Sequence, residues 1–197
     1  MMWALLVGYL VGSIPTADLI GRARGVDLRT TGTGNPGTAN ALRVVGRGAA
    51  IAILLLDLAK GAGVAALGRA LDGDATGVAA AIAAVTGQVL NPWFRFHGGK
   101  GLGVAAGTAL VLWPLGLGAV LPLVALGAVT VRAAVGALLG LLALFGLSLV
   151  WAAEGWAPLW GIHPDDTLVW FTLGIGVLTI PKFIGDLTGR SRDHPNA

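Results

Sequence analysis

Long apolar segments recur along the chain, and they limit what it can fold into more than any other feature does. A helix needs about 20 apolar residues to cross a membrane, with a usual range of roughly 17–25. Seven apolar segments are predicted, most of them of this length, at residues 2–21, 49–70, 77–94, 102–113, 115–131, 133–151 and 167–185. The fourth is short and ends at Trp113-Pro114, so a partial or tilted helix is expected there. The expected fold class is an all-α integral membrane protein, a seven-transmembrane-helix bundle.

The composition supports this fold class. Hydrophobic residues make up 55% of the chain and charged residues 12%, whereas a soluble domain usually carries about 25% charged residues. No polar stretch is long enough to be a soluble domain, so residues 1–197 are expected to form a single polytopic membrane domain. The absence of cysteine excludes disulfide bonds and thiolate metal sites.

Positive charges are concentrated on one side of this seven-segment arrangement. That side carries Arg22, Arg24, Arg29, Arg43, Arg47, Arg95, Lys100, Arg132, Lys182, Arg190 and Arg192. Cytoplasmic loops of membrane proteins are enriched in Lys and Arg. Loops 22–48 and 95–101 are therefore predicted to face the cytoplasm together with the C-terminus, while the N-terminus faces out. The net charge of +3 is then a signal of topology, and no nucleic-acid partner is expected.

The first basic loop contains the sequence TTGTGNPGTAN, in which Gly32, Gly34 and Gly37 have G-x-G-x-x-G spacing. A dinucleotide site needs a strand before such glycines, a helix after them and an acidic residue about 20 residues further on. Here a membrane helix is predicted before the glycines, and Asp57 lies inside the second apolar segment. This context argues against a dinucleotide, and leaves a flexible turn or a different phosphate site.

Side chains in the same loop favour the phosphate site. Glycines let backbone N–H groups approach an anion closely, and the loop is rich in small polar residues, namely Thr30, Thr31, Thr33, Asn35, Thr38 and Asn40. Arg43 follows Asn40 by three residues and can reach the same ligand if a helix begins there. Arginine is well suited to contacting phosphate with two hydrogen bonds.

A second basic loop, FRFHGGKG, has similar chemistry. Gly98 and Gly99 precede Lys100, which lies at the start of the fourth apolar segment. A helix N-terminus attracts anions through its free N–H groups and its dipole. The alternative is that Lys100 only anchors the topology at the membrane boundary. Two such loops on one face favour a joint phosphate site.

Polar residues also occur inside the apolar segments. Asp57 and Lys60 are three residues apart on one helix face, and an ion pair that fixes helix packing is the favoured interpretation. Ser13 either lines a cavity where the first segment bends at Pro15 or makes a hydrogen bond between helices. Tryptophans near segment ends are expected to anchor in the membrane interface, namely Trp93, Trp113, Trp151, Trp156 and Trp160.

Four stretches together resemble a known family. GYLVGSIPTADLIGR, DLRTTGTGNPGTANALRVVG, LLLDLAKG and FRFHGGKG look like the bacterial acyl-phosphate-dependent glycerol-3-phosphate acyltransferases, the PlsY family, over roughly residues 8 to 108. The resemblance implies an enzyme of phospholipid biosynthesis in the bacterial cytoplasmic membrane. It would transfer a fatty acyl group from acyl phosphate to the sn-1 hydroxyl of glycerol 3-phosphate, giving lysophosphatidic acid and phosphate. It implies membrane lipids as surroundings, and no cofactor or metal.

The resemblance also assigns roles to residues. Thr33 stands where the family has serine, and Asn35, Asn40, Arg43 and Lys100 match the family as they stand. Thr33, Arg43 and Lys100 are the expected catalytic residues. The expected substrate or phosphate ligands are Ser13, Gly32, Gly34, Asn35, Gly37, Asn40, Gly98 and Gly99.

The chain departs from the family pattern at several positions. Gln88 and His97 stand where the family usually has histidine and lysine, and Pro181 and Ile184 occupy the places of His and Asn in an HREN-like third motif. The missing third motif leaves open a non-catalytic relative that binds phosphate or lipid. The basic loops and intramembrane charges leave open a transporter of a phosphorylated solute. A transporter is expected to show a pair of internal repeats, and the sequence shows none.

Overall fold

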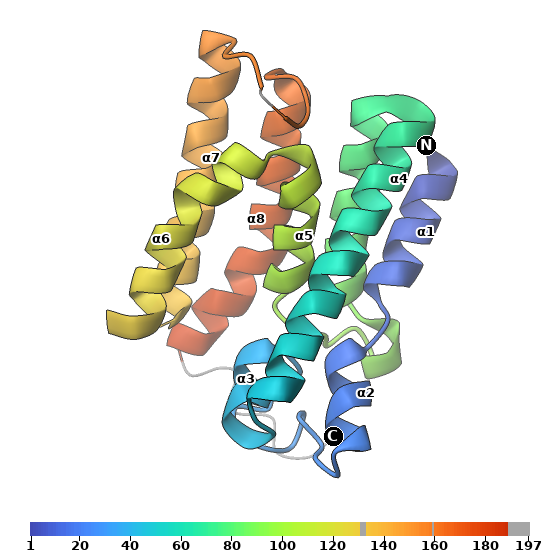
Figure 1. The fold of residues 1–197 in the computed structure, drawn as a ribbon, viewed down its shortest axis with the longest axis vertical. Helices are drawn as coiled ribbons and strands as arrows, with labels where there is room; N and C mark the ends of the chain where they lie inside the picture. The colour runs from blue at the N-terminus through green and yellow to red at the C-terminus, as the bar shows by residue number, and fades with distance from the viewer. Residues whose placement is uncertain (131–132, 159, 189–197) are drawn as a thin grey trace.

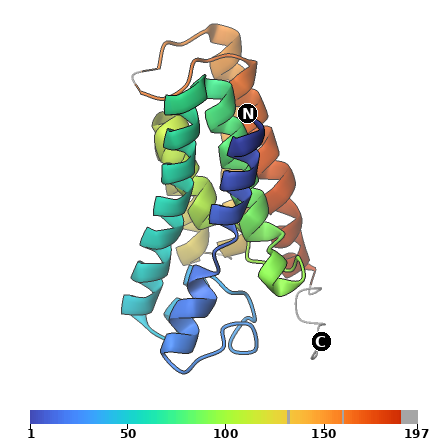
Figure 2. The ribbon, with the colours of Figure 1, turned by 90° about the vertical axis from the view of Figure 1, so that its right-hand side faces the viewer.

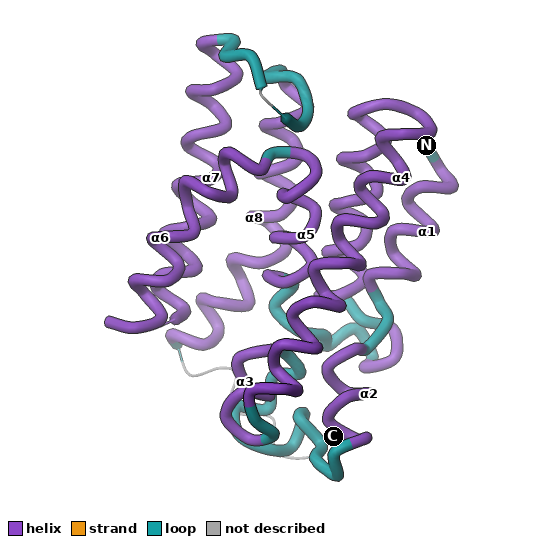
Figure 3. The backbone as a smooth tube through the Cα atoms, in the orientation of Figure 1, coloured by secondary structure: helices purple, strands orange, loops and turns teal. Residues whose placement is uncertain are grey.

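The computed structural model describes residues 1–130, 133–158 and 160–188, and it is a bundle of helices (Figure 1). Every regular element in these ranges is helical (Figure 3). The elements are α1 Met2–Gly12, α2 Thr16–Ala23, α3 Thr38–Val44, α4 Arg47–Val89, a 3-10 turn Pro92–Phe94, α5 Leu102–Leu112, α6 Pro114–Thr130, α7 Ala133–Glu154 and α8 Asp166–Leu187. The predicted cations Arg132, Arg190 and Arg192 lie outside the described residues.

The second and third predicted spans are both present, folded back on each other within α4. The backbone leaves the helical region at Asp72 and Gly73, and Gly73 has a φ of 81°, which glycine adopts without strain. The candidate membrane span ends at Phe94, as predicted, but its α-helix ends at Val89 and a 3-10 turn forms the last residues, Pro92–Phe94. Asn91 precedes a proline, which disfavours helical backbone, and its side chain accepts a hydrogen bond from the Trp93 N–H.

The first predicted span is broken where the sequence places Pro15. Because proline has no N–H and a fixed φ, it cannot continue a helix from the preceding turn, and α1 and α2 are separate helices. Small residues let α1 lie very close to α4: a Cβ on Gly8 or Gly12 would collide with the backbone oxygens of Ala80 or Ala84. Close backbone packing of this kind is the usual way that membrane helices associate.

The fourth span is short, as predicted. At 11 residues, α5 is about 16 Å long against a hydrocarbon core of about 30 Å. The chain between α7 and α8 covers its end, where the Ile162 N–H donates to the Leu112 carbonyl at 2.8 Å.

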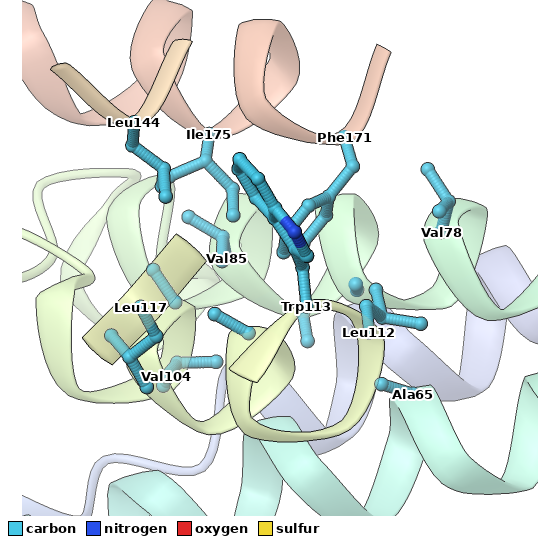
Figure 4. Close-up of a cluster of buried hydrophobic side chains, with 14 of the residues drawn as sticks. Ala65, Val78, Val85, Val104, Leu112, Trp113, Leu117, Leu144, Phe171 and Ile175 are labelled. Atoms are coloured by element: carbon cyan, nitrogen blue, oxygen red, sulfur yellow. The ribbon is translucent and has the colours of Figure 1, made fainter. Parts of the chain in front are cut away.

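Trp113, at the end of α5, is a core residue rather than an interfacial anchor, and that prediction is wrong. Its side chain is 1% exposed and lies among apolar residues of several helices (Figure 4). It meets the ring of Trp151 edge to face, with centroids 5.8 Å apart. Because α5 ends inside the bundle, the tryptophan that follows it is covered by α7 and α8.

The two ends of the bundle differ in charge. One end holds α2, α3, the segment 91–101 and the last turns of α8 (Figures 1 and 2). It carries the described cations of the two basic loops and Lys182. The other end holds the turn of α4 and residues 155–158 and 160–165, and Arg69 is paired there with Asp74 at 2.7 Å. All seven predicted spans are helical in the described residues, with the two basic loops at one end.

Candidate phosphate-binding site

The first glycine loop is held in shape by the side chain of Asn40. Its amide nitrogen donates to the carbonyls of Leu28 and Thr31, both at 2.9 Å, and its amide oxygen accepts from the Thr33 N–H at 2.9 Å. Asn40 is 1% exposed. Since its donors and its acceptor are used within the loop, Asn40 positions the loop, and its direct contact with phosphate stays a prediction.

Two glycines make this loop conformation possible. Gly32 and Gly34 have φ values of 68° and 73°, in the left-handed region that side chains disfavour. A Cβ on Gly32 would also collide with the amide oxygen of Asn40. The conformation of the loop is therefore set by residues of the chain itself.

Other residues predicted to contact phosphate lie in this loop or in the helix after it. The Thr33 hydroxyl is exposed and accepts weakly from the Asn35 N–H at 3.4 Å. Gly37 precedes α3, so the helix that was expected to carry Arg43 is present. Arg43 is in the last turn of α3 and exposed, and its contact with a phosphate stays a prediction.

The second loop is equally constrained. Asn91 is 2% exposed, and its amide donates to the Ser13 carbonyl at 2.8 Å, which ties the loop to the break between α1 and α2. A Cβ on Gly98 would collide with the Gln88 carbonyl, so glycine is required there by packing. The Ser13 hydroxyl donates to the Leu10 carbonyl at 2.8 Å. Ser13 thus supports the loop through its carbonyl, and its predicted ligand role stays a prediction.

The two glycine loops meet. A Cβ on Gly99 would lie 3.1 Å from the Pro36 carbonyl, and Arg29 of the first loop stacks over Phe94 of the second, 4.6 Å from the ring centre. Between the loops lies a cavity of about 10 Å³, lined by Pro15, Ala17, Asp18, Pro36, Gln88, Asn91, Phe94 and Gly99. We call this meeting place the loop seam.

The end of α8 brings further charges to the second loop. Lys100 forms an ion pair with Asp186, and its ammonium lies over the Phe183 ring, 4.9 Å from the centroid. Lys182 donates to the Gly98 carbonyl at 3.5 Å. The charge pattern of the sequence assigns Lys182 to the topology only, and it assigns no role to Asp186. Their spacing of four residues in the last turns of the final helix is the signal that could have revealed them.

A second ion pair lies deeper in the bundle. Asp57 and Lys60 are 2.9 Å apart, with side chains 7% and 8% exposed. Lys60 also donates to the Ile14 carbonyl at 2.9 Å and to the Gln88 amide oxygen at 3.0 Å, and Thr16 donates to Asp57 at 2.6 Å. The packing interpretation is confirmed, since the pair joins the α1–α2 break to both halves of α4.

An apolar groove of about 360 Å³ lies along α8 and the second half of α4. Its lining residues are Ile82, Thr86, Trp170, Leu173, Gly174, Val177 and Leu178. Lys182 lies one helical turn beyond Leu178, so the groove runs toward the cationic end of the bundle.

Neither a metal centre nor a dinucleotide fold is found in the described residues. Residues 1–130, 133–158 and 160–188 hold no group of three His, Cys, Asp or Glu residues placed to share a metal ion. The glycine loop lies between α2 and α3 and follows no strand. The context that a dinucleotide site requires is therefore missing from this part of the chain.

Comparison with known proteins places this chain in a family. The family described as glycerol-3-phosphate acyltransferase matches residues 2–188. The chain belongs to the glycerol-3-phosphate acyltransferase, or PlsY, family. A glycerol-3-phosphate acyltransferase of Rubrobacter xylanophilus is 48% identical over 116 residues, which is 58% of each chain. Glycerol-3-phosphate acyltransferase 1 of Deinococcus radiodurans is 36% identical over 169 residues, 85% of each chain.

The matched part spans slightly less than three fifths of the first of these relatives. The fold is shared with the crystal structure of PlsY (YgiH), an integral membrane glycerol 3-phosphate acyltransferase, in its glycerol 3-phosphate form. The TM-score is 0.81 at 24% identity, covering 100% of this chain and 95% of the other.

Proposed function

We propose that this protein transfers a fatty acyl group from acyl phosphate to the sn-1 hydroxyl of glycerol 3-phosphate. The observation that carries the proposal is the loop seam, where two preshaped glycine loops meet beside Lys100 and Lys182. Membership of the family supports glycerol 3-phosphate as the acceptor. Lysophosphatidic acid and inorganic phosphate would be the products.

The reaction needs no covalent enzyme intermediate. The sn-1 hydroxyl oxygen forms a bond to the acyl carbonyl carbon, and the bond between that carbon and the phosphate oxygen breaks. Phosphate leaves with the electron pair, and a phosphate oxygen of a substrate takes the hydroxyl proton. Fixed cations and amide groups that stabilise the developing charge supply the main catalytic effect, and binding both substrates together supplies proximity.

The proposal gives each of the predicted site residues a role. Lys100 and Arg43 provide charge for the phosphates, and Thr33 and Asn35 provide polar contacts from the first loop. The amides of Gly32, Gly34, Gly37, Gly98 and Gly99 line the two loops. Asp186 holds the Lys100 ammonium until a phosphate competes for it.

The apolar groove supports the proposal because it offers a binding place for the acyl chain. It is lined almost entirely by apolar side chains, and the hydroxyl of its one threonine, Thr86, donates to the Ile82 carbonyl at 2.8 Å. A chain lying there would point its phosphate end toward Lys182 and Lys100. The acyl donor would thus arrive from the bilayer and glycerol 3-phosphate from the cytoplasm.

Purified protein in detergent tests the function. Release of inorganic phosphate from acyl phosphate should require glycerol 3-phosphate, and acyl coenzyme A should not replace the acyl phosphate. Binding of both substrates without turnover would instead support a non-catalytic relative. Flux of glycerol 3-phosphate into liposomes without acyl transfer would support a transporter.

We also propose that the basic end faces the cytoplasm of a bacterial cell, in its cytoplasmic membrane. The cations of loops 22–48 and 95–101 support this orientation. The chain has no native cysteine, so a single cysteine in place of Thr30 reports on the loop alone. An impermeant thiol reagent should label it only after the cells are opened, and labelling of intact cells would refute the orientation.

A further inference from the structure

The loop seam contains a carboxylate that the proposed reaction does not yet use. Asp18 lines the cavity of about 10 Å³ and is 7% exposed. Its Oδ2 is bonded to the Arg22 guanidinium at 2.8 Å. Its Oδ1 is buried and has no hydrogen-bond partner. A buried polar atom without a partner is costly and rare in proteins, so a hydrogen-bond donor is expected to fill this position.

The charge of Asp18 limits what that donor is. Arg22 already neutralises the carboxylate, with its own side chain largely exposed to solvent. A second cation is therefore not needed in the cavity, and a neutral O–H or N–H group is sufficient to satisfy Oδ1. A neutralised carboxylate is also compatible with a phosphorylated ligand close by.

Gln88 supplies the complementary group. Its amide oxygen accepts from Lys60 at 3.0 Å, which fixes the orientation of the amide. The Nε2 group, which carries two N–H donors, is thereby left on the side of Gly99: a Cβ on Gly99 would lie 3.6 Å from it. Gln88 and Gly99 both line the cavity.

A hydroxyl group fits both partners and the available space. It donates one hydrogen bond and accepts others, so it can donate to Asp18 Oδ1 and accept from Gln88 Nε2. A cavity of about 10 Å³ holds one oxygen atom with its hydrogens. The cavity is only partly enclosed, so it can admit a hydroxyl, but at about 10 Å³ it has no room for an acyl group beside it. The hydroxyl bound there is therefore not the one that reacts with the acyl carbon.

We propose that Asp18 and Gln88 bind the secondary, non-reacting hydroxyl of glycerol 3-phosphate in the cavity of the loop seam. This inference rests on the proposed function and adds a determinant of acceptor specificity to it. The residues would hold the acceptor with its primary hydroxyl toward the acyl donor.

The test compares two acceptors that differ by this hydroxyl. 3-Hydroxypropyl phosphate keeps the phosphate and the primary hydroxyl of glycerol 3-phosphate and lacks the secondary one. The kcat/KM for each acceptor is measured with the wild type and with Asp18→Ala and Asp18→Asn, alongside melting in detergent. A hydrogen bond to a charged group corresponds to a preference of about 10- to 100-fold for glycerol 3-phosphate in the wild type.

In Asp18→Ala this preference should fall to within about threefold of unity, and in Asp18→Asn it should fall to an intermediate value. The control is Arg22→Gln, which removes the ion pair but keeps the carboxylate, and it should retain the preference. An unchanged preference in both Asp18 variants, with turnover intact, would mean that the cavity holds an ordered water only. That result overturns the inference and leaves the acyltransferase proposal standing. Absence of wild-type turnover with either acceptor would overturn both.

Discussion

The two lysine–aspartate pairs of the bundle show how burial separates a structural charge from a usable one. Lys60 and Asp57 are less than a tenth exposed and bond to Ile14, Thr16 and Gln88 as well as to each other. Lys100 and Asp186 are about a quarter exposed, with side chains 24% and 27% accessible, at the mouth of the glycine loops. The charged groups of the buried pair are thus bonded to several other groups of the protein. In the proposed function, Lys100 exchanges Asp186 for a phosphate of the substrate.

The largest effect is expected on the free energy of unfolding, when the buried pair of Lys60 and Asp57 is broken. Lys60→Met leaves Asp57 buried without its cation, which costs about 3–5 kcal/mol of the free energy of unfolding. Replacing both residues, in Lys60→Met with Asp57→Leu, should recover much of that loss because no charge stays buried. Unfolding in detergent measures both variants. Equal losses in the single and double variants would show that the pair is not the source of the effect.

The next effect concerns catalysis at the second pair. Lys100→Met should lower the rate of acyl transfer by about 10²–10³-fold, or roughly 3–4 kcal/mol, because one preorganised contact to the transferring phosphate is lost. Its melting temperature should stay near that of the wild type. Arg95→Met is the matched control, since Arg95 is an exposed cation of the same segment. Near-normal turnover of well-folded Lys100→Met would assign Lys100 to topology alone.

A smaller effect on catalysis is expected at Asn40, which holds the first glycine loop in shape. Asn40→Ala removes three hydrogen bonds within the first glycine loop and should lower kcat/KM for glycerol 3-phosphate about 30-fold, or about 2 kcal/mol. Amide exchange should accelerate at residues 28–34 and stay unchanged at residues 155–165. Unchanged amide exchange in the loop would contradict the role of Asn40 in holding it in shape.

The smallest effect concerns the apolar groove. Val177 is 64% exposed and lines the groove, so Val177→Phe should shift the preference toward shorter acyl phosphates by about threefold to tenfold, the range for one or two displaced methylenes. Leu139→Phe, at an exposed position of α7, is the control. Identical chain-length profiles for both variants would place the acyl chain elsewhere.

The sequence by itself determined the parts of this protein that depend on periodicity and composition. Apolar length gave the spans, because hydrocarbon thickness sets how many residues a helix needs. The Pro15 break and the short fourth span were also predictable, since they follow from local backbone chemistry. The glycine spacing together with Arg43 and Lys100 indicated a phosphate site before any contact was known.

Only the tertiary structure decided which distant residues meet. Lys182 and Asp186 lie more than 80 residues from Lys100, and no local pattern shows that the end of α8 packs beside the second loop. Trp113 was misplaced for the same reason, because its burial depends on α7 and α8 covering the end of α5. The pairing of Asp18 with Gln88 at one cavity is likewise a product of packing. Helix packing in a membrane depends on small residues and shape rather than on hydrophobic pattern, so the sequence alone could not fix these contacts.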